Sequence, residues 1–395
     1  MKTGELMSGG MIKQQRHHEL DWLRAIVVLN LIPFHAAWLI LFVPGFSRIG
    51  QSFIGTVAGH YVRFISPLHM FLLFFVSGAS VHIALGYRSV GTYIIERIKR
   101  LLIPLIFFML VLFPVLAFYW PPVTEKPSLS AYLAFWPEIL KTTFYSSYSG
   151  GPQWAHLWFV AYLLIFSLIM LPMFLRWRKS PESGTIPKLA AFSEKRGAIF
   201  VLSIPLILIF ALLSPIWPFF RNNLLSDWGY FTYNLMAFVF GFMFMKDSRF
   251  WTAVDRVFKV SLLLAVMAAM ARLGVSLWFP HFTVPDYSPG YLLYSILSGL
   301  NTWFWVVGIL GLARKTLGFG NTFLKYFNRI SYSFYIFHLV VMVGIGYYVT
   351  RWHLGFLLEF LILIILSLAA TILCCEIVKR NSWTALFLGI KKSSR

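Results

Sequence analysis

The sequence predicts an all-α membrane protein, a polytopic bundle of about ten transmembrane helices with both termini in the cytoplasm. Three observations lead to this fold class. Of 395 residues, 59% are hydrophobic and 12% are charged, whereas soluble domains carry about 25% charged residues. The apolar residues form runs long enough to cross a bilayer, which takes about 20 residues. Lys and Arg concentrate in alternate connections between these runs. This pattern excludes a water-soluble globule and a disordered chain, which has low hydrophobicity.

Ten segments are long and apolar enough to be spans. They are 22–43, 65–86, 101–120, 156–175, 198–218, 229–245, 260–279, 290–312, 330–350 and 354–378. The predicted organisation is a cytoplasmic N-terminal segment 1–20, a transmembrane domain 21–378 and a cytoplasmic tail 379–395. A shorter apolar piece, 129–140, lies in the exterior connection 121–155. It indicates either interfacial packing or a part in acceptor binding.

The basic residues set the orientation, because cytoplasmic connections carry an excess of Lys and Arg. Of the 34 Lys and Arg residues, 26 lie in the termini and the connections on their side, and 6 lie in the opposite connections. Arg24 and Arg272 fall inside predicted spans. A pI near 10 is also typical of nucleic-acid binding. Here the positive charge lies between hydrophobic runs, so we expect a bilayer as partner and no nucleic acid.

Arg24 and His35 in the first span are the clearest candidate functional pair. They are eleven residues apart, which places both on one helix face and about 16 Å apart along its axis. Ionisable residues inside a span are costly and tend to be functional. The alternative is an arginine that reaches toward the interface and a histidine that is buried and hydrogen-bonded.

Arg97 and Arg100 form a second candidate site before the third span. They are three residues apart and share a helix face, with Lys99 beside them. Paired arginines can hold phosphates through two parallel hydrogen bonds each. Anchoring of the span at the cytoplasmic interface explains these residues equally well.

Two further segments carry polar residues at spans. His156 and Trp158 stand where the fourth span begins, in a position that an interfacial aromatic belt also explains. Ser331, Tyr335 and His338 fall at i, i+4 and i+7 on one face of the ninth span. That stripe indicates either catalytic groups or polar contacts between helices.

No metal site is expected. Cys374 and Cys375 are adjacent, and no Cys/His spacing matches the zinc patterns. His69, in the second span, is given no role.

Taken together these segments resemble acyltransferase family 3, whose members are integral-membrane acyltransferases. The resemblance rests on Arg24-x10-His35, FFVSG at 74–78, Arg97-x-x-Arg100 before a proline, HLWF at 156–159 and SYSFYIFH at 331–338. These motifs stand in the family's order and cover nearly the whole chain. The chain length and the sequence around His35 are most similar to the branch of the family that modifies periplasmic glucans, usually by succinylation. Many relatives have an acidic or aromatic residue at the position of His69.

The resemblance implies an enzyme of the EC 2.3.1 type in the cytoplasmic (inner) membrane of a bacterium. It would move an acyl group, acetyl or succinyl, from cytoplasmic acyl-CoA to a hydroxyl of an extracytoplasmic glycan or related acceptor. In this interpretation His35 is the general base, and Arg24, Arg97 and Arg100 hold the CoA phosphates. The remaining candidates would orient His35 or stabilise the oxyanion (Ser331, Tyr335, His338) or face the acceptor (His156, Trp158).

Two other functions also accommodate intramembrane Arg and His residues. A transporter or flippase of a lipid-linked saccharide is the main alternative, although inverted repeats and interrupted helix pairs, which are common in transporters, are not found in the sequence. A non-catalytic assembly scaffold is the second.

Overall fold

The computed structural model describes residues 17–43, 46, 53–120, 127–144, 152, 154–217, 219–220, 223–381, 384 and 387–389. Most of the predicted N-terminal segment and most of the predicted tail lie outside the described residues. Every regular element in the described part of the chain is helical. The fold is therefore all-α, as the sequence predicts.

The first half of the chain forms shorter and more irregular helices than the second half. It comprises α1 (His18–Phe42), α2 (Phe53–Tyr87), α3 (Val90–Arg97), α4 (Ile103–Phe107), α5 (Phe113–Phe118), α6 (Leu129–Thr143), α7 (Trp158–Ile169), α8 (Leu171–Arg178), α9 (Thr185–Ser193) and α10 (Ile204–Leu208). The second half comprises α11 (Trp228–Lys246), α12 (Arg249–Trp278), α13 (Pro289–Thr316), α14 (Thr322–Val349) and α15 (Phe356–Lys379).

Each of the ten predicted spans contains helix. Among the described residues, seven helices are long and apolar enough to cross a membrane, and the pair α7–α8, bent by 52°, raises this number to eight. The predicted span 198–218 corresponds to the shorter apolar helix Ala198–Leu213. The predicted span 229–245 corresponds to α11, which has 19 residues. The chain is a multi-pass membrane protein, and the number ten stays a prediction.

The third predicted span is one helix from Val90 to Phe118 that contains two π-helical turns. These turns, Ile98–Leu102 and Phe108–Leu112, each precede a proline. Proline has no N–H and clashes with the carbonyl of the preceding turn, so the helix widens locally instead of breaking. Arg100 lies in the first of these turns.

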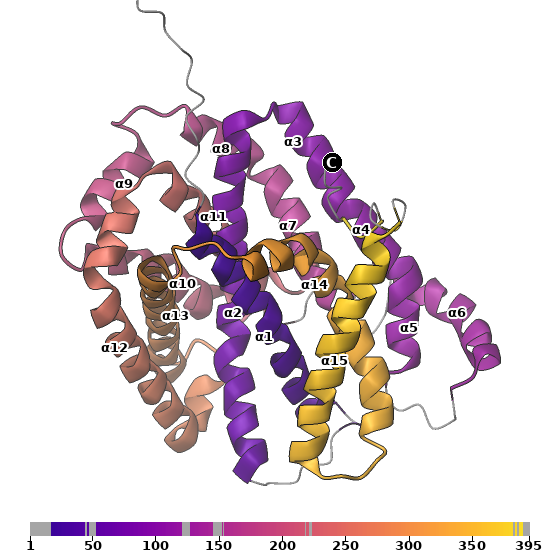
Figure 1. Ribbon diagram of the computed structural model, residues 1–395. Coiled ribbons are helices and arrows are strands. Elements are labelled where there is room, and N and C mark those ends of the chain that lie inside the picture. The colour runs from indigo at the N-terminus through magenta and orange to yellow at the C-terminus, as the bar shows by residue number, and fades with distance from the viewer. Residues whose placement is uncertain are drawn as a thin grey trace, which may run out of the picture.

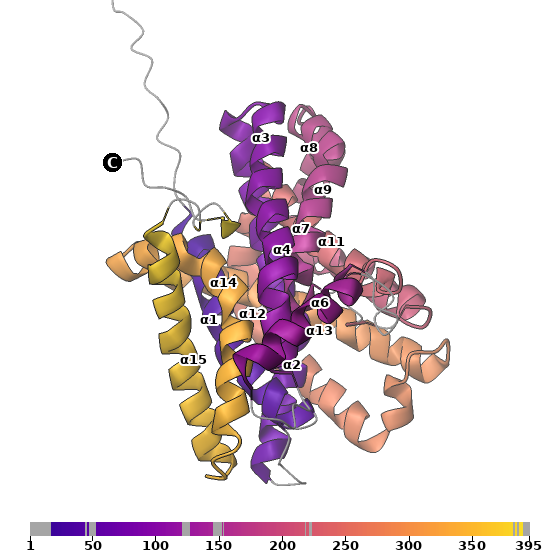
Figure 2. The same ribbon diagram turned by 90° about the vertical axis from the view of Figure 1, so that its right-hand side faces the viewer.

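Helix α2 occupies the middle of the bundle. It packs along both α1 and α11, the antiparallel pair α12–α13 lies on one side of it, and α14–α15 lies on the other (Figure 1). Helix α6 lies at the outer edge beside α5 in Figure 1, and it faces the viewer when the bundle is turned by 90° (Figure 2). The start of α1 and the end of α15 lie toward the same side of the bundle in both figures, as an even number of spans requires.

Helices α2 and α11 approach so closely that only glycine fits at their contact. A Cβ on Gly78 would lie 1.8 Å from the carbonyl oxygen of Phe238, and one on Gly241 would lie 1.9 Å from that of Phe75. Small residues at such contacts let membrane helices gain packing where no hydrophobic driving force acts between them. Gly78 closes the FFVSG segment, so this motif is explained at least in part by helix packing.

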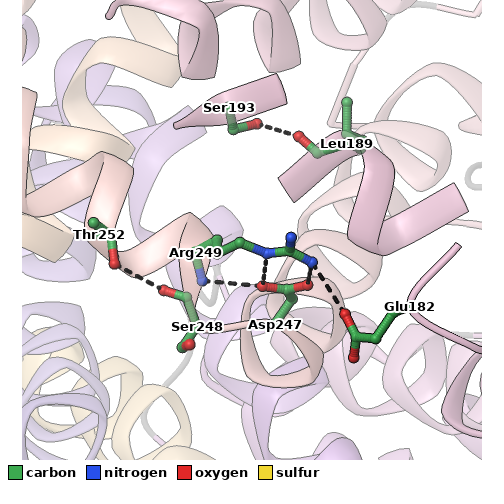
Figure 3. Close-up of polar contacts among 7 residues, drawn as sticks. All are labelled: Glu182, Leu189, Ser193, Asp247, Ser248, Arg249 and Thr252. Atoms are coloured by element: carbon green, nitrogen blue, oxygen red, sulfur yellow. Dashed lines mark hydrogen bonds and ion pairs between the residues drawn. The ribbon is translucent and has the colours of Figure 1, made fainter. Parts of the chain in front are cut away.

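A polar cluster connects two loops on the side of the bundle that carries α8 and α9 (Figure 3). The Arg249 guanidinium donates to both carboxylate oxygens of Asp247, at 2.9 and 2.6 Å, and reaches Glu182 at 3.4 Å. These bonds from Arg249 hold the pKa of the Asp247 carboxyl below its ordinary value. The cluster ties the start of α12 to the loop between α8 and α9.

We expect Gly78→Ala to lower the thermal stability of the detergent-solubilised protein, because the new methyl group forces α2 and α11 apart. Overpacking of this kind costs about 1–3 kcal/mol. The matched control is Gly59→Ala on the same helix, where a Cβ has nothing within 4 Å. Equal melting temperatures for the two variants would contradict the assigned role of the α2–α11 contact.

Candidate active site

His35 of α1 and His338 of α14, 303 residues apart in the sequence, meet inside the bundle. The Nδ1 atom of His35 lies 3.2 Å from the Nε2 atom of His338, and the two ring centroids are 5.0 Å apart. His338 is fully buried, whereas His35 is partly exposed. The sequence predicts both residues as candidates and offers His338, with Ser331 and Tyr335, to orient His35 or stabilise the oxyanion.

The surrounding carbonyls fix which ring nitrogens carry protons, because a carbonyl oxygen only accepts hydrogen bonds. His338 Nδ1 lies 2.6 Å from the carbonyl oxygen of Tyr335, so Nδ1 carries the proton and Nε2 of the neutral ring accepts. His35 Nδ1 faces that acceptor and also the carbonyl oxygen of Leu31 at 3.1 Å. His35 Nδ1 is therefore the protonated nitrogen, and His35 Nε2 holds the lone pair. We assign these tautomers from the hydrogen-bond network.

His156 is hydrogen-bonded to the same part of α14. Its Nε2 atom donates to the carbonyl oxygens of Tyr335 and Ile336, both at 3.1 Å, and the Tyr335 hydroxyl donates back to the carbonyl of His156. The His156 and His338 ring centroids are 4.9 Å apart, nearly perpendicular. This reciprocal contact joins the start of α7 to the turn of α14 that carries His338.

His69 of α2 is a fourth histidine at this place, and the sequence predicts no role for it. Its Nδ1 atom lies 2.6 Å from the carbonyl oxygen of Ile65, and its ring packs on Phe34 with centroids 4.6 Å apart. His69 is close enough to His35 to act on it electrostatically. Its spacing from Pro67 and FFVSG carries no signal that would have revealed this proximity.

The three arginines that the sequence singled out gather at the end of α1 opposite to the histidines. Arg24 donates to the Ser80 hydroxyl of α2 at 3.1 Å and lies 4.0 Å from Asp21. Arg97 and Arg100 both interact electrostatically with Arg24. Three cations near one another repel, so the group is suited to hold a multiply charged anion. Ser80 was missed, because a serine inside a span carries no distinguishing sequence signal.

Described parts of the C-terminal region also border this arginine group. Leu388 is buried, and its carbonyl oxygen accepts a hydrogen bond from Ser333 at 3.3 Å. A Cβ on Gly389 would lie 2.6 Å from the Tyr332 ring and 3.3 Å from the carbonyl oxygen of Arg100. The sequence predicts no contact between the tail and the site.

Two predicted site residues do not contact the histidines in the described contacts. Trp158 is buried against the rings of Phe74, Tyr162 and Tyr230, within an aromatic core. Ser331 is buried and hydrogen-bonds to the carbonyl oxygen of Asn328 at 3.4 Å, on its own helix. Ser331 lies two turns, about 10 Å, before His338.

Within the described part of the chain, no group of His, Cys, Asp and Glu side chains has the arrangement of a metal site. The histidine rings instead bond to helix carbonyls and to each other. What the arrangement offers is a base, His35 Nε2, held in one orientation about 16 Å along α1 from a cationic group.

The described part of the chain is thus an all-α bundle of membrane-length helices in which histidines from α1 and α14 meet. The family model for the acyltransferase domain of acyltransferase family 3 matches residues 17–376, nearly the whole chain. The chain therefore belongs to this family and is a membrane acyltransferase, which decides against the transporter and scaffold alternatives. No curated protein and no solved structure matches the chain.

We expect Tyr335→Phe to lower the melting temperature, because it removes the hydroxyl that donates to the carbonyl of His156. An unsatisfied buried acceptor costs about 1–3 kcal/mol. Tyr332→Phe is the matched control, since the buried Tyr332 hydroxyl has no hydrogen-bond partner among the described residues. The melting temperatures of the two purified variants are compared by thermal unfolding. An equal decrease in both would refute the stabilising role of the contact between Tyr335 and His156.

Proposed function

We propose that this enzyme transfers an acyl group, acetyl or succinyl, from cytoplasmic acyl-CoA to a hydroxyl of a glycan outside the cytoplasmic membrane of a bacterium, with His35 as general base. The observation that carries the proposal is the His35–His338 pair, in which one nitrogen of His35 is held and the other is left with its lone pair. The donor and acceptor classes are those that the family resemblance implies.

The pair supports general-base catalysis in which His35 is the base and His338 is the partner that orients its ring. His35 Nε2 would take the proton of the acceptor hydroxyl while that oxygen attacks the thioester carbonyl. The C–S bond then breaks, and the proton on Nε2 passes to the departing CoA sulfur, which returns His35 to its neutral form. While His35 is positively charged, its Nδ1–H donates to His338 Nε2, and His338 in turn donates to the carbonyl of Tyr335. No net proton is consumed.

The arginine group supports a donor site on the cytoplasmic side. Arg97 and Arg100 lie on an exposed or half-exposed helix turn, and Arg24 stands behind them on α1. Guanidinium groups bind phosphates through paired charge-assisted hydrogen bonds. With the CoA phosphates held there, the pantetheine arm would extend along α1 and bring the thioester toward His35.

His156 and Tyr335 support the reaction as positioning residues. Their side chains are buried and bond to backbone carbonyls, so they set the place of the α14 turn and of His338 without touching the acceptor themselves. Trp158 packs on the rings of Phe74, Tyr162 and Tyr230 and is assigned no contact with the acceptor. Ser331 is assigned no contact with the reacting atoms.

We expect His35→Ala to lower acyl transfer by at least about 10²-fold, the range that a general base supplies. His338→Phe should lower kcat by about tenfold or more with little change in KM, because it removes the acceptor that orients His35. Acylated glycan is measured at matched protein levels. His82→Ala is the control, since that histidine lies on α2 against Phe242. Wild-type transfer by His35→Ala would overturn the mechanism.

For the donor site, Arg97→Gln and Arg100→Gln should each weaken acyl-CoA binding about tenfold, or ~1.4 kcal/mol, because each removes a charged phosphate partner. Lys99→Gln removes the same charge from the same turn on a different helix face, and we expect it to bind nearly as the wild type does. Calorimetric titration of purified protein with acyl-CoA measures the affinities. Equal losses in all three variants would indicate a general effect of charge, and unchanged affinity in both Arg variants would remove them from the site.

A further inference from the structure

A second polar region lies on α13, away from the histidines and arginines of the proposed active site. Tyr294, Ser298, Asn301 and Trp305 fall at i, i+4, i+7 and i+11, which places them on one helix face. The face begins about 8 Å from the start of α13 at Tyr294 and continues toward the middle of the span. Polar side chains at this depth need partners, because the bilayer core supplies no water.

Arg272 of α12 meets this face. Its guanidinium donates to the Tyr294 hydroxyl at 3.1 Å and lies 5.3 Å from the centroid of the Tyr294 ring. It also interacts electrostatically with Tyr233 of α11. Among the described residues, no carboxylate lies within ion-pair distance of Arg272, so its positive charge is not neutralised by this part of the chain.

Arg272 lies close to the end of α12, beside a group of exposed aromatic residues. It stands six residues before Trp278, the last residue of α12, which is about 9 Å along the helix. Trp278, Phe279 and Tyr287 beyond it are exposed by 76%, 48% and 57%, as aromatic residues at a membrane–water interface are. An arginine just inside such a belt is within reach of lipid phosphates.

Three buried polar atoms of this region lack a hydrogen-bond partner among the described residues. They are Nε of Arg272, Oδ1 of Asn301 and Nε1 of Trp305. Asn301 is only 5% exposed, and its oxygen and nitrogen can exchange places by a flip of the amide. Each buried polar atom without a partner costs about 1–3 kcal/mol, so groups of this kind mark a place for a ligand or ordered water.

Arg272 and Tyr294 are both half-buried, so neither side chain is closed off from the surface of the bundle. An arginine pairs with a phosphate by two parallel hydrogen bonds and is the side chain best suited to it. Nε is covered by protein atoms, so a phosphate would pair with Nη1 and with Nη2, the nitrogen that also donates to Tyr294.

We propose that Arg272, with Tyr294 and the polar face of α13, binds the phosphate group of a lipid-borne molecule in the half of the bilayer next to connection 280–288. Two sources carry that chemistry: a phospholipid headgroup, and a polyprenyl phosphate of the kind that carries glycans. The site is separate from the His35–His338 pair, so it is tested by binding and not by acyl transfer.

The experiment uses the full-length protein, delipidated in neutral detergent, and measures its melting temperature with added lipid. The probes are phosphatidylglycerol, a polyprenyl phosphate and, as a matched lipid without phosphate, diacylglycerol. We expect a phosphate-bearing lipid to raise the melting temperature of the wild type and diacylglycerol to raise it little. Arg272→Gln should lose most of that rise. Lys259→Gln, which removes one positive charge from the same helix about 20 Å before Arg272, should keep it.

A larger rise with phosphatidylglycerol supports the headgroup source, and a larger rise with the polyprenyl phosphate supports the carrier source. An equal rise in the wild type and in Arg272→Gln, or an equal rise with diacylglycerol, overturns the site. Because Arg272→Gln could fail to fold, Arg272→Lys provides a second variant that keeps the charge and loses the paired geometry, and it should lose part of the rise. Native mass spectrometry of the wild type adds a test without mutation: failure to retain phosphate lipids over diacylglycerol also overturns the proposal.

Discussion

The site depends on one constraint, that a polar group buried in a bilayer must find its hydrogen-bond partner inside the protein. The histidines of this enzyme find it in helix carbonyls: His35 bonds to Leu31, His69 to Ile65 and His338 to Tyr335. Each bond occupies Nδ1 and thereby defines the protonation of the ring. The same bond that makes burial tolerable leaves Nε2 of each ring available. In His338 the Nε2 atom accepts a hydrogen bond from His35, and in His35 the Nε2 atom keeps its lone pair.

Helix α14 holds several of these buried polar groups in one place. It supplies His338 and the carbonyls of Tyr335 and Ile336 that hold His156, so one turn of helix fixes histidines from two parts of the chain. The position of α1 beside it is set from the other side by α2. The glycine contacts between α2 and α11 anchor α2, and Ser80 on α2 receives Arg24 of α1. Gly78 and Gly241, far from His35 in the sequence, are thus connected to the position of His35 by packed helices.

The positive charge of the protein has three distinct origins. Most Lys and Arg residues lie in the termini and in the connections that the sequence assigns to the cytoplasm, a distribution that predicts the orientation of the bundle. A second group, Arg24, Arg97 and Arg100, is gathered by the fold into one place near the end of α1. Arg272 belongs to neither. It lies inside the membrane-spanning part of α12, where its contacts are aromatic and not acidic, and such an isolated charge is costly unless an anion accompanies it.

The sequence by itself determined the fold class and the candidate residues. Long apolar runs specify membrane helices whatever their neighbours are, and helical spacing places Arg24 with His35, and Tyr335 with His338, on shared faces. It could not determine which faces meet, because helix–helix contacts depend on shapes that spacing does not encode. Only the tertiary structure brought His35 to His338, added His69 and Ser80, turned His156 toward the carbonyls of α14 and placed Trp158 in an aromatic core. The physical reason is that periodicity acts within one helix, whereas hydrogen bonds between residues 303 positions apart exist only once the helices pack.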